Sequence, residues 1–107
     1  MIRVRFSIGN NRLHGFEISG HSMYAPQGQD IVCASVSSAA LMAANTITEI
    51  IKAPARAEAE DGSMIFHLSE TNERTEAVLR GLELHLTELS KQYPLNIKVI
   101  YGGVKNA

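Results

Sequence analysis

Apolar and polar residues alternate in two short segments at the start of the chain, with the period of two that is typical of half-buried strands. In the first segment the apolar positions are Ile2, Val4, Phe6 and Ile8, and in the second one face carries His14, Phe16 and Ile18. Gly and Asn at positions 9–11 favour a turn between the segments, because both residue types tolerate positive φ. The pattern predicts a hairpin that ends near Gly20, followed by a loop over residues 22–29.

From Asp30 onward the apolar spacing changes from two to steps of three and four. The residues that recur at this spacing are Val32, Val36, Ala40, Ala43, Ile47 and Ile50. They would form one apolar face of a helix. Asp30 is a suitable N-cap for this helix, because its carboxylate can accept a backbone N–H from the first turn, and Pro54 is expected to end it.

Two further strand-like segments lie at residues 55–60 and 64–68, on either side of Asp61-Gly62. This dipeptide favours a type I′ turn, in which both central residues need positive φ. The two segments are therefore expected to pair as a second hairpin.

A second helix is predicted between Thr71 or Asn72, either of which can act as its N-cap, and Tyr93-Pro94. Its apolar stripe consists of Val78, Leu82, Leu86 and Leu89. Residues 97–101 then alternate as a last strand. The predicted order is ββαββαβ, an α+β fold of two layers with two helices packed on a mainly antiparallel sheet, forming a single domain over residues 1–107.

The composition is that of a folded domain, since 45% of the 107 residues are hydrophobic and 20% are charged. The formal net charge of -1 gives no reason to expect direct nucleic-acid binding. The first ten residues lack the apolar segment of a signal peptide, and no apolar run is expected to approach the roughly 18 residues that cross a bilayer. The sequence predicts a cytoplasmic protein with no membrane partner.

The single cysteine, Cys33, would lie in the first turn of the first helix, where free N–H groups and the helix dipole favour a thiolate. Asp30 on the same turn opposes that effect. His21, at the end of the second strand, could form with Cys33 the pair used by cysteine hydrolases. The alternatives from pattern alone are a small buried hydrophobic residue at Cys33 and a solvated histidine at His21.

The remaining histidines, His14, His67 and His85, have surface or packing roles in this interpretation. No CxxC or HxxxH pair marks a metal site, and no glycine pattern marks a phosphate loop. We therefore expect no metal and no cofactor.

The segment Gly20-His21-Ser22, together with residues 28–37 (GQDIVCASVS), resembles the ribosomal-processing cysteine proteases, the Prp family. The resemblance implies a homodimeric cytoplasmic endopeptidase that removes the N-terminal extension of a large-subunit bacterial ribosomal protein, which supports ribosome assembly. It implies that His21 and Cys33 are catalytic and that Asp30 and Ser37 support them. The expected partners are the ribosomal protein precursor and a second copy of the chain.

The resemblance also implies that the loop between His21 and Cys33 gates the site. The loop residues assigned to this role are Ser22, Met23, Tyr24 and Gly28. In the implied mechanism Cys33 attacks the scissile carbonyl, His21 protonates the departing amine, and N–H groups at the start of the helix bind the oxyanion. Ser37 would brace the site, and Asp30 would either orient His21 or cap the helix.

Two other functions remain open from the sequence. A non-catalytic, ribosome-associated binding module would have a buried Cys33 that reacts slowly with iodoacetamide. A thiol redox sensor would react with peroxide without cutting peptides. The absence of a second cysteine argues against the sensor.

Overall fold

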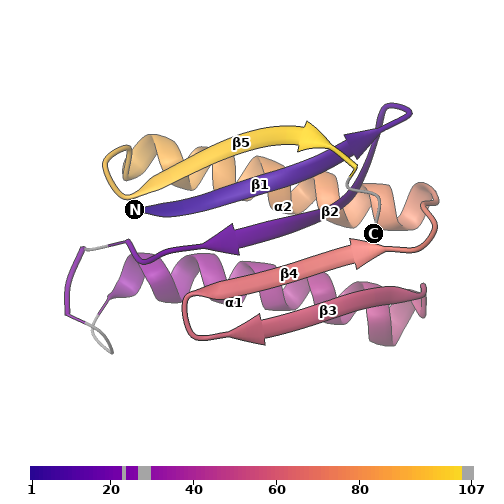
Figure 1. Ribbon diagram of the computed structural model, residues 1–107, viewed down its shortest axis with the longest axis horizontal. Helices are drawn as coiled ribbons and strands as arrows, with labels where there is room; N and C mark the ends of the chain where they lie inside the picture. The colour runs from indigo at the N-terminus through magenta and orange to yellow at the C-terminus, as the bar shows by residue number, and fades with distance from the viewer. Residues whose placement is uncertain (23, 27–29, 105–107) are drawn as a thin grey trace.

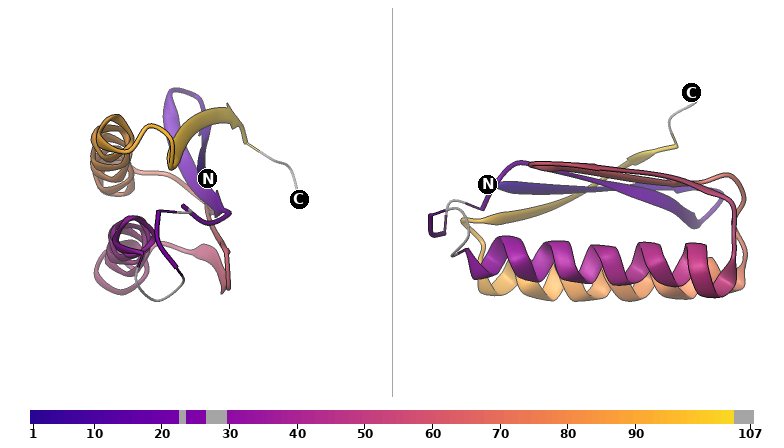
Figure 2. Two further views of the ribbon diagram at one scale, coloured as in Figure 1. Left: turned by 90° about the vertical axis from the view of Figure 1, so that its left-hand side faces the viewer. Right: turned by 90° about the horizontal axis from the view of Figure 1, so that it is seen from below.

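The computed structural model describes residues 1–22, 24–26 and 30–104. The elements are β1 (Ile2–Gly9), β2 (Arg12–Ser19), α1 (Ile31–Asn45), η1 (Thr46–Ile51), β3 (Ala55–Glu60), β4 (Ser63–Leu68), α2 (Glu73–Gln92) and β5 (Ile97–Gly103). The five strands form one sheet in the order β3-β4-β2-β1-β5 (Figure 1). Among the strands in the described residues only β1 and β5 pair in parallel, and the helices cover one face of the sheet (Figure 2). The predicted ββαββαβ order and two-layer α+β architecture are confirmed.

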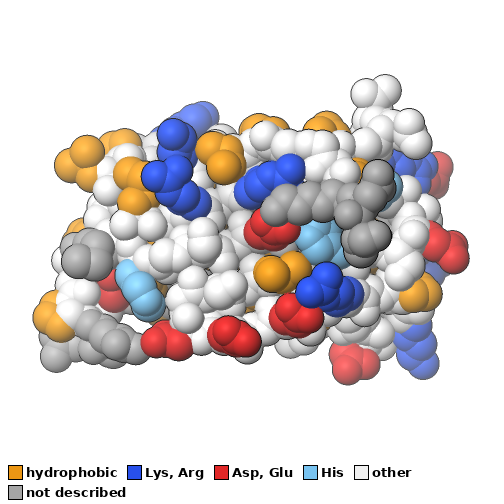
Figure 3. Space-filling model, viewed as in Figure 1, with side chains coloured by type: hydrophobic (Ala, Val, Ile, Leu, Met, Phe, Trp, Pro, Cys, Tyr) orange, Lys and Arg blue, Asp and Glu red, His pale blue; other side chains and the backbone are white. Residues whose placement is uncertain are grey.

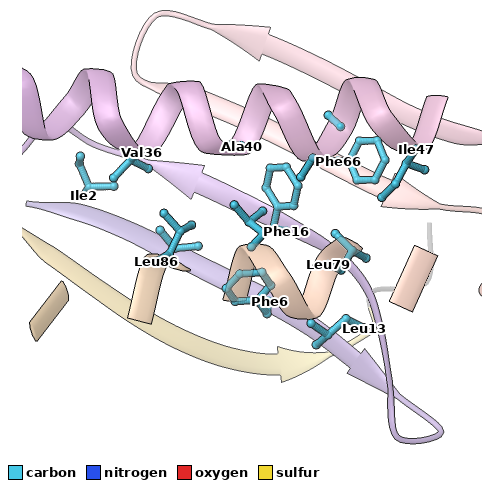
Figure 4. Packing of buried hydrophobic residues seen from close by; sticks show 14 of the residues in the cluster. Ile2, Phe6, Leu13, Phe16, Val36, Ala40, Ile47, Phe66, Leu79 and Leu86 are labelled. Carbon is cyan, nitrogen blue, oxygen red and sulfur yellow. The ribbon is translucent and has the colours of Figure 1, made fainter. Parts of the chain in front are cut away.

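Three phenylalanines form the centre of the buried sheet face. Phe6, Phe16 and Phe66 are in register across β1, β2 and β4, and all three are fully buried. Their ring centroids are 6.5 and 5.4 Å apart in the two neighbouring pairs. The helices cover these rings with Val36, Ala40, Ile47, Leu79 and Leu86 (Figure 4). This packing holds α1 against the sheet, so that the start of α1 lies beside the end of β2.

The first hairpin contains a bulge that the period-two pattern did not predict. Ser7 pairs with Gly15, whereas Ile8 pairs with Leu13, so His14 is an extra residue in β2. Leu13 is fully buried, while His14 is partly exposed with its Nε2 3.1 Å from the Gly9 carbonyl oxygen. The expectation that His14 shares one strand face with Phe16 and Ile18 is wrong, because the bulge shifts the alternation of side chains by one residue.

The first helix also ends differently from the prediction. After α1 the chain continues into the π-helical segment η1 and stops at Lys52, whose left-handed backbone has φ 60°, two residues before Pro54. A π-helix bonds residues five apart, so a turn contains more residues than in an α-helix. Ile51, four positions after Ile47, therefore packs against the core, and Ile50 is 76% exposed. The assignment of Ile50 to the apolar face is wrong.

We expect the substitutions Ile47→Ala and Ile50→Ala to differ strongly in their effect on stability. Loss of the buried Ile47 side chain should lower the free energy of unfolding by about 3 kcal/mol. Loss of the exposed Ile50 side chain should change it by no more than about 0.5 kcal/mol. Urea unfolding followed by circular dichroism measures the free energy of unfolding of both variants. Equal decreases in the two variants would contradict the π-helical register.

The helical segment Ile31–Ile51 has 21 residues and a mean hydropathy of 1.5, so in the described part of the chain it is long and apolar enough to cross a membrane. By this measure the expectation that no such segment exists is wrong. The expectation considered uninterrupted apolar runs, whereas here serine and threonine are interspersed with alanine, isoleucine and valine. In the fold, buried residues of this segment pack against the sheet.

Candidate active site

A cleft of about 860 Å³ lies where the end of β2, the start of α1 and the β3–β4 turn meet. In Figure 1 this is the end of the molecule at which the chain passes from β2 into α1. The residues that line the cleft include His21, Asp30, Cys33 and Ser37. The structure therefore brings the two expected catalytic residues and the two expected supporting residues to one cavity.

Cys33 lies in the first turn of α1 and is partly exposed to the cleft. The backbone N–H of Ser22 donates to its sulfur at 3.3 Å, and the Ser22 hydroxyl oxygen lies 3.6 Å from the same sulfur. A backbone N–H directed at the sulfur and the positive end of the helix both stabilise negative charge there. Cys33 is therefore open to the cleft and is not a sealed core residue.

Asp30 is the N-cap of α1. Its Oδ1 accepts the backbone N–H groups of Val32 and Cys33, each at 3.0 Å. The alternative that Asp30 orients His21 has no support in the described residues, where no hydrogen bond joins the two. Oxyanion donors were expected among the N–H groups at the start of the helix, and two of these, on Val32 and Cys33, are already bonded to the Asp30 carboxylate.

The other oxygen of Asp30 holds the segment that precedes the helix. Oδ2 accepts the Ser22 hydroxyl and two backbone N–H groups, those of Tyr24 at 3.2 Å and Ala25 at 3.4 Å. Desolvation acts to raise the pKa of Asp30, but the hydrogen bonds from Ser22, Cys33, Ala25 and Tyr24 outweigh it and lower this pKa from 3.8 to about 2. The carboxylate is therefore charged at neutral pH and links the loop to the helix.

His21 lies two residues after the end of β2, at the edge of the cleft, with its imidazole beside the β3–β4 turn. A side chain at Gly62 would meet His21 Nε2 at 3.0 Å, and Gly62 itself has a φ of +75°. The Gly20 N–H donates to the Gly62 carbonyl at 3.0 Å, which fixes the strand end against the turn. Among the described residues no hydrogen bond joins His21 to Cys33, although both side chains line the same cavity.

The comparison with protein families decides how this cleft is interpreted. The family model described as cysteine protease Prp matches residues 1–98. The chain belongs to the cysteine protease Prp family. It is 26% identical over 91 residues, covering 78% of this chain and 81% of the relative, to the ribosomal processing cysteine protease Prp of Bacillus subtilis (strain 168).

Solved structures show the same fold as this Prp-family chain. The essential ribosomal processing protease Prp from S. aureus, in complex with a covalently linked product peptide, matches with a TM-score of 0.90. The match covers 95% of this chain and all of that one at 22% identity. The S. aureus protease with a substrate peptide matches with a TM-score of 0.84, again at 22% identity and over 95% and 100% of the two chains. The fold, the family and the cysteine protease class agree.

The sequence did not reveal how closely Ser22 is held. Its side chain is buried, and its carbonyl accepts the side-chain N–H of Asn96 at 2.8 Å. No local pattern marks Asn96, because its partner is 74 residues away along the chain. Of the other residues assigned to a gating loop, Tyr24 is half exposed, whereas Met23 and Gly28 lie outside the described residues.

The low pKa of Asp30 predicts a pH-dependent contribution to stability. An amide at this position can still accept the helix N–H groups at one oxygen, but it cannot accept three donors at the other. We expect Asp30→Asn to lower the free energy of unfolding by about 1 to 2 kcal/mol at neutral pH. Because the pKa in the folded protein is depressed, the stabilisation by the carboxylate is present above pH 3.8 and is lost as the pH falls through about 2.

Urea unfolding of the wild type and of Asp30→Asn at several pH values measures this contribution. The stability difference between the two proteins should narrow as the pH falls from 3.8 toward 2. A difference that stays constant over this interval would show that the Asp30 charge is not what holds the loop.

Proposed function

We propose that this Prp-family chain is an endopeptidase that removes the N-terminal extension of a large-subunit ribosomal protein precursor in the cytoplasm, acting as a homodimer. The observation that carries the proposal is the cleft shared by His21 and Cys33, in which a backbone N–H is directed at the cysteine sulfur. Two relatives are themselves named as ribosomal processing proteases, which supports the substrate.

In the proposed reaction the Cys33 thiolate attacks the scissile carbonyl and forms a carbon–sulfur bond. The amide C–N bond then breaks while protonated His21 gives its proton to the departing amine. A water molecule, deprotonated by His21, hydrolyses the resulting thioester and releases the new carboxylate. Ser37 lies one helical turn after Cys33 with its side chain exposed to the cleft, where it can contact either the substrate or the thiol.

The walls of the cleft indicate what kind of peptide it accepts. Its partly exposed apolar lining includes Ile18 and Met64, which suits a large apolar side chain near the scissile bond. Glu60 and Asp61 also line the cleft. In the space-filling view, acidic side chains lie along the lower edge of the molecule (Figure 3). A basic residue close to the apolar one would complement Glu60 and Asp61.

The proposal is tested by incubating the full-length ribosomal protein precursor with the enzyme and measuring intact masses. Loss of a single N-terminal fragment is expected, and the mature form of the same protein should remain unchanged as a control. Enzyme alkylated at Cys33 with iodoacetamide should leave the precursor intact. A precursor that stays uncut but co-purifies with the chain would instead support the binding module, and sedimentation of the free chain tests the homodimer.

A further inference from the structure

Ser22 is fixed from three directions at the point where the chain leaves β2. Its hydroxyl donates to Asp30 Oδ2, its carbonyl accepts from Asn96 Nδ2 at 2.8 Å, and its own N–H donates to Cys33 Sγ at 3.3 Å. The residue is only 1% exposed. Any rotation of this backbone segment would therefore change the direction of the one N–H that points at the cysteine sulfur.

Asn96 comes from the connection between α2 and β5, and its backbone is itself held firmly. Its N–H donates to the Tyr93 carbonyl at 3.0 Å, and its own carbonyl accepts the Ile2 N–H at 2.8 Å. The Tyr93 ring also packs edge-on against Tyr24, with centroids 5.5 Å apart and an interplanar angle of 84°. The α2–β5 connection thus contacts the segment before α1 at two separate places.

We propose that Asn96 is a positioning residue of the peptidase site: by holding the Ser22 carbonyl it keeps the Ser22 N–H on the Cys33 sulfur and His21 at the edge of the cleft. The inference rests on the proposed function, because it takes Cys33 as the nucleophile. Among the described residues Asn96 does not line the cleft, so we expect no direct contact between Asn96 and the substrate. Its role is exerted through the neighbouring backbone.

The substitution Asn96→Asp tests this role with little change in shape, because it replaces the amide donor with a carboxylate oxygen facing the Ser22 carbonyl. We expect kcat for a peptide that spans the cleavage junction to fall about 10-fold to 100-fold. We expect KM to change by less than about twofold, because the residue does not bind the substrate. The rate of Cys33 alkylation by iodoacetamide at neutral pH, measured without substrate, should fall by a factor of roughly 3 to 10.

Asn45→Asp is the matched control, since Asn45 is exposed at the end of α1 and its side chain makes no capping bond. It adds the same charge and should leave kcat and alkylation unchanged. If Asn96→Asp melts below the assay temperature, Asn96→Ala removes the donor without adding charge.

Wild-type kcat and alkylation rates in a folded Asn96 variant would overturn the inference. Unfolding of both Asn96 variants would also overturn it, because the residue would then be structural. Should the wild type fail to cut the precursor, the proposed function fails, while the alkylation rates still decide whether Asn96 controls the thiol.

Discussion

Replacing Cys33 with alanine is expected to reduce cleavage of a junction-spanning peptide by about 10⁴-fold or more. The substitution removes the only sulfur nucleophile in the chain, and water alone attacks a peptide bond extremely slowly. Because Cys33 is partly exposed and alanine keeps an apolar group against the core, the fold should survive the change. Mass spectrometry measures the initial rates of peptide cleavage by the wild type and by Cys33→Ala. Circular dichroism of both proteins shows whether the variant is folded.

Ser35→Ala serves as the control for the Cys33 substitution. Ser35 lies on the same helix, is exposed, and donates its hydroxyl only to the Ile31 carbonyl at 2.7 Å, one turn back. Its loss should leave the cleavage rate within about twofold of the wild type. A folded Cys33→Ala protein that retains more than about one hundredth of wild-type activity would show that another group attacks the peptide.

The strands and helices could be predicted wherever the apolar spacing is regular. The second helix shows this well, because Asn72 caps it through the N–H groups of Arg74 and Thr75, each at 2.9 Å. The predicted apolar stripe of this helix, which runs from Val78 to Leu89, omitted Leu79, although Leu79 is fully buried. α2 packs against both the sheet and the neighbouring α1, so it buries a wider face than a single stripe (Figure 2).

The two errors in the fold, at His14 and Ile50, have a common cause. A bulge and a π-helical turn each change the count of residues per repeat, and neither leaves a mark in the pattern of residue types alone. Each is decided by the pairing or packing of the neighbouring elements, which favours burial of Leu13 and Ile47. Local spacing could not supply that information.

In the candidate site, too, local contacts could be predicted from the sequence and long-range contacts could not. Asp30 and Cys33 are three residues apart, so capping chemistry could place the carboxylate on the Cys33 N–H from sequence alone. The link from Ser22 to Asn96 joins segments that meet only after β5 has paired with β1. Contacts of this kind depend on the whole topology, and for that reason the sequence indicated candidate reactive groups but not the residues that contact them from distant segments.

The fold also explains why one carboxylate serves two purposes at this site. A free helix N-terminus would attract the Cys33 thiolate but leave the preceding loop unattached. Asp30 uses one oxygen for the helix and the other for the loop, so the negative charge that caps α1 also holds Ser22 against the cysteine. The Ser22 N–H that this arrangement directs at the Cys33 sulfur is 3.3 Å from it.

Replacing His21 with alanine should reduce peptide cleavage by about 10³-fold, because the departing amine must be protonated as the C–N bond breaks. The exposed imidazole lies beside Gly62 at the edge of the cleft and makes no hydrogen bond with the described residues, so the variant should remain folded. His85→Ala, which removes an exposed histidine from α2, should leave cleavage unchanged and is the matched control.

An activated ester separates the acid role of His21 from a role in folding. With a p-nitrophenyl ester of an apolar amino acid, the Cys33 thiolate forms the thioester while nitrophenolate leaves without needing a proton. His21→Ala should therefore release a burst of nitrophenolate close to one equivalent of enzyme and then stop, because no base activates water for hydrolysis of the thioester. Cys33→Ala should give no burst. Steady turnover of the ester by His21→Ala, or no burst from it while the protein remains folded, would contradict the assignment of His21 as the proton donor and acceptor of the reaction.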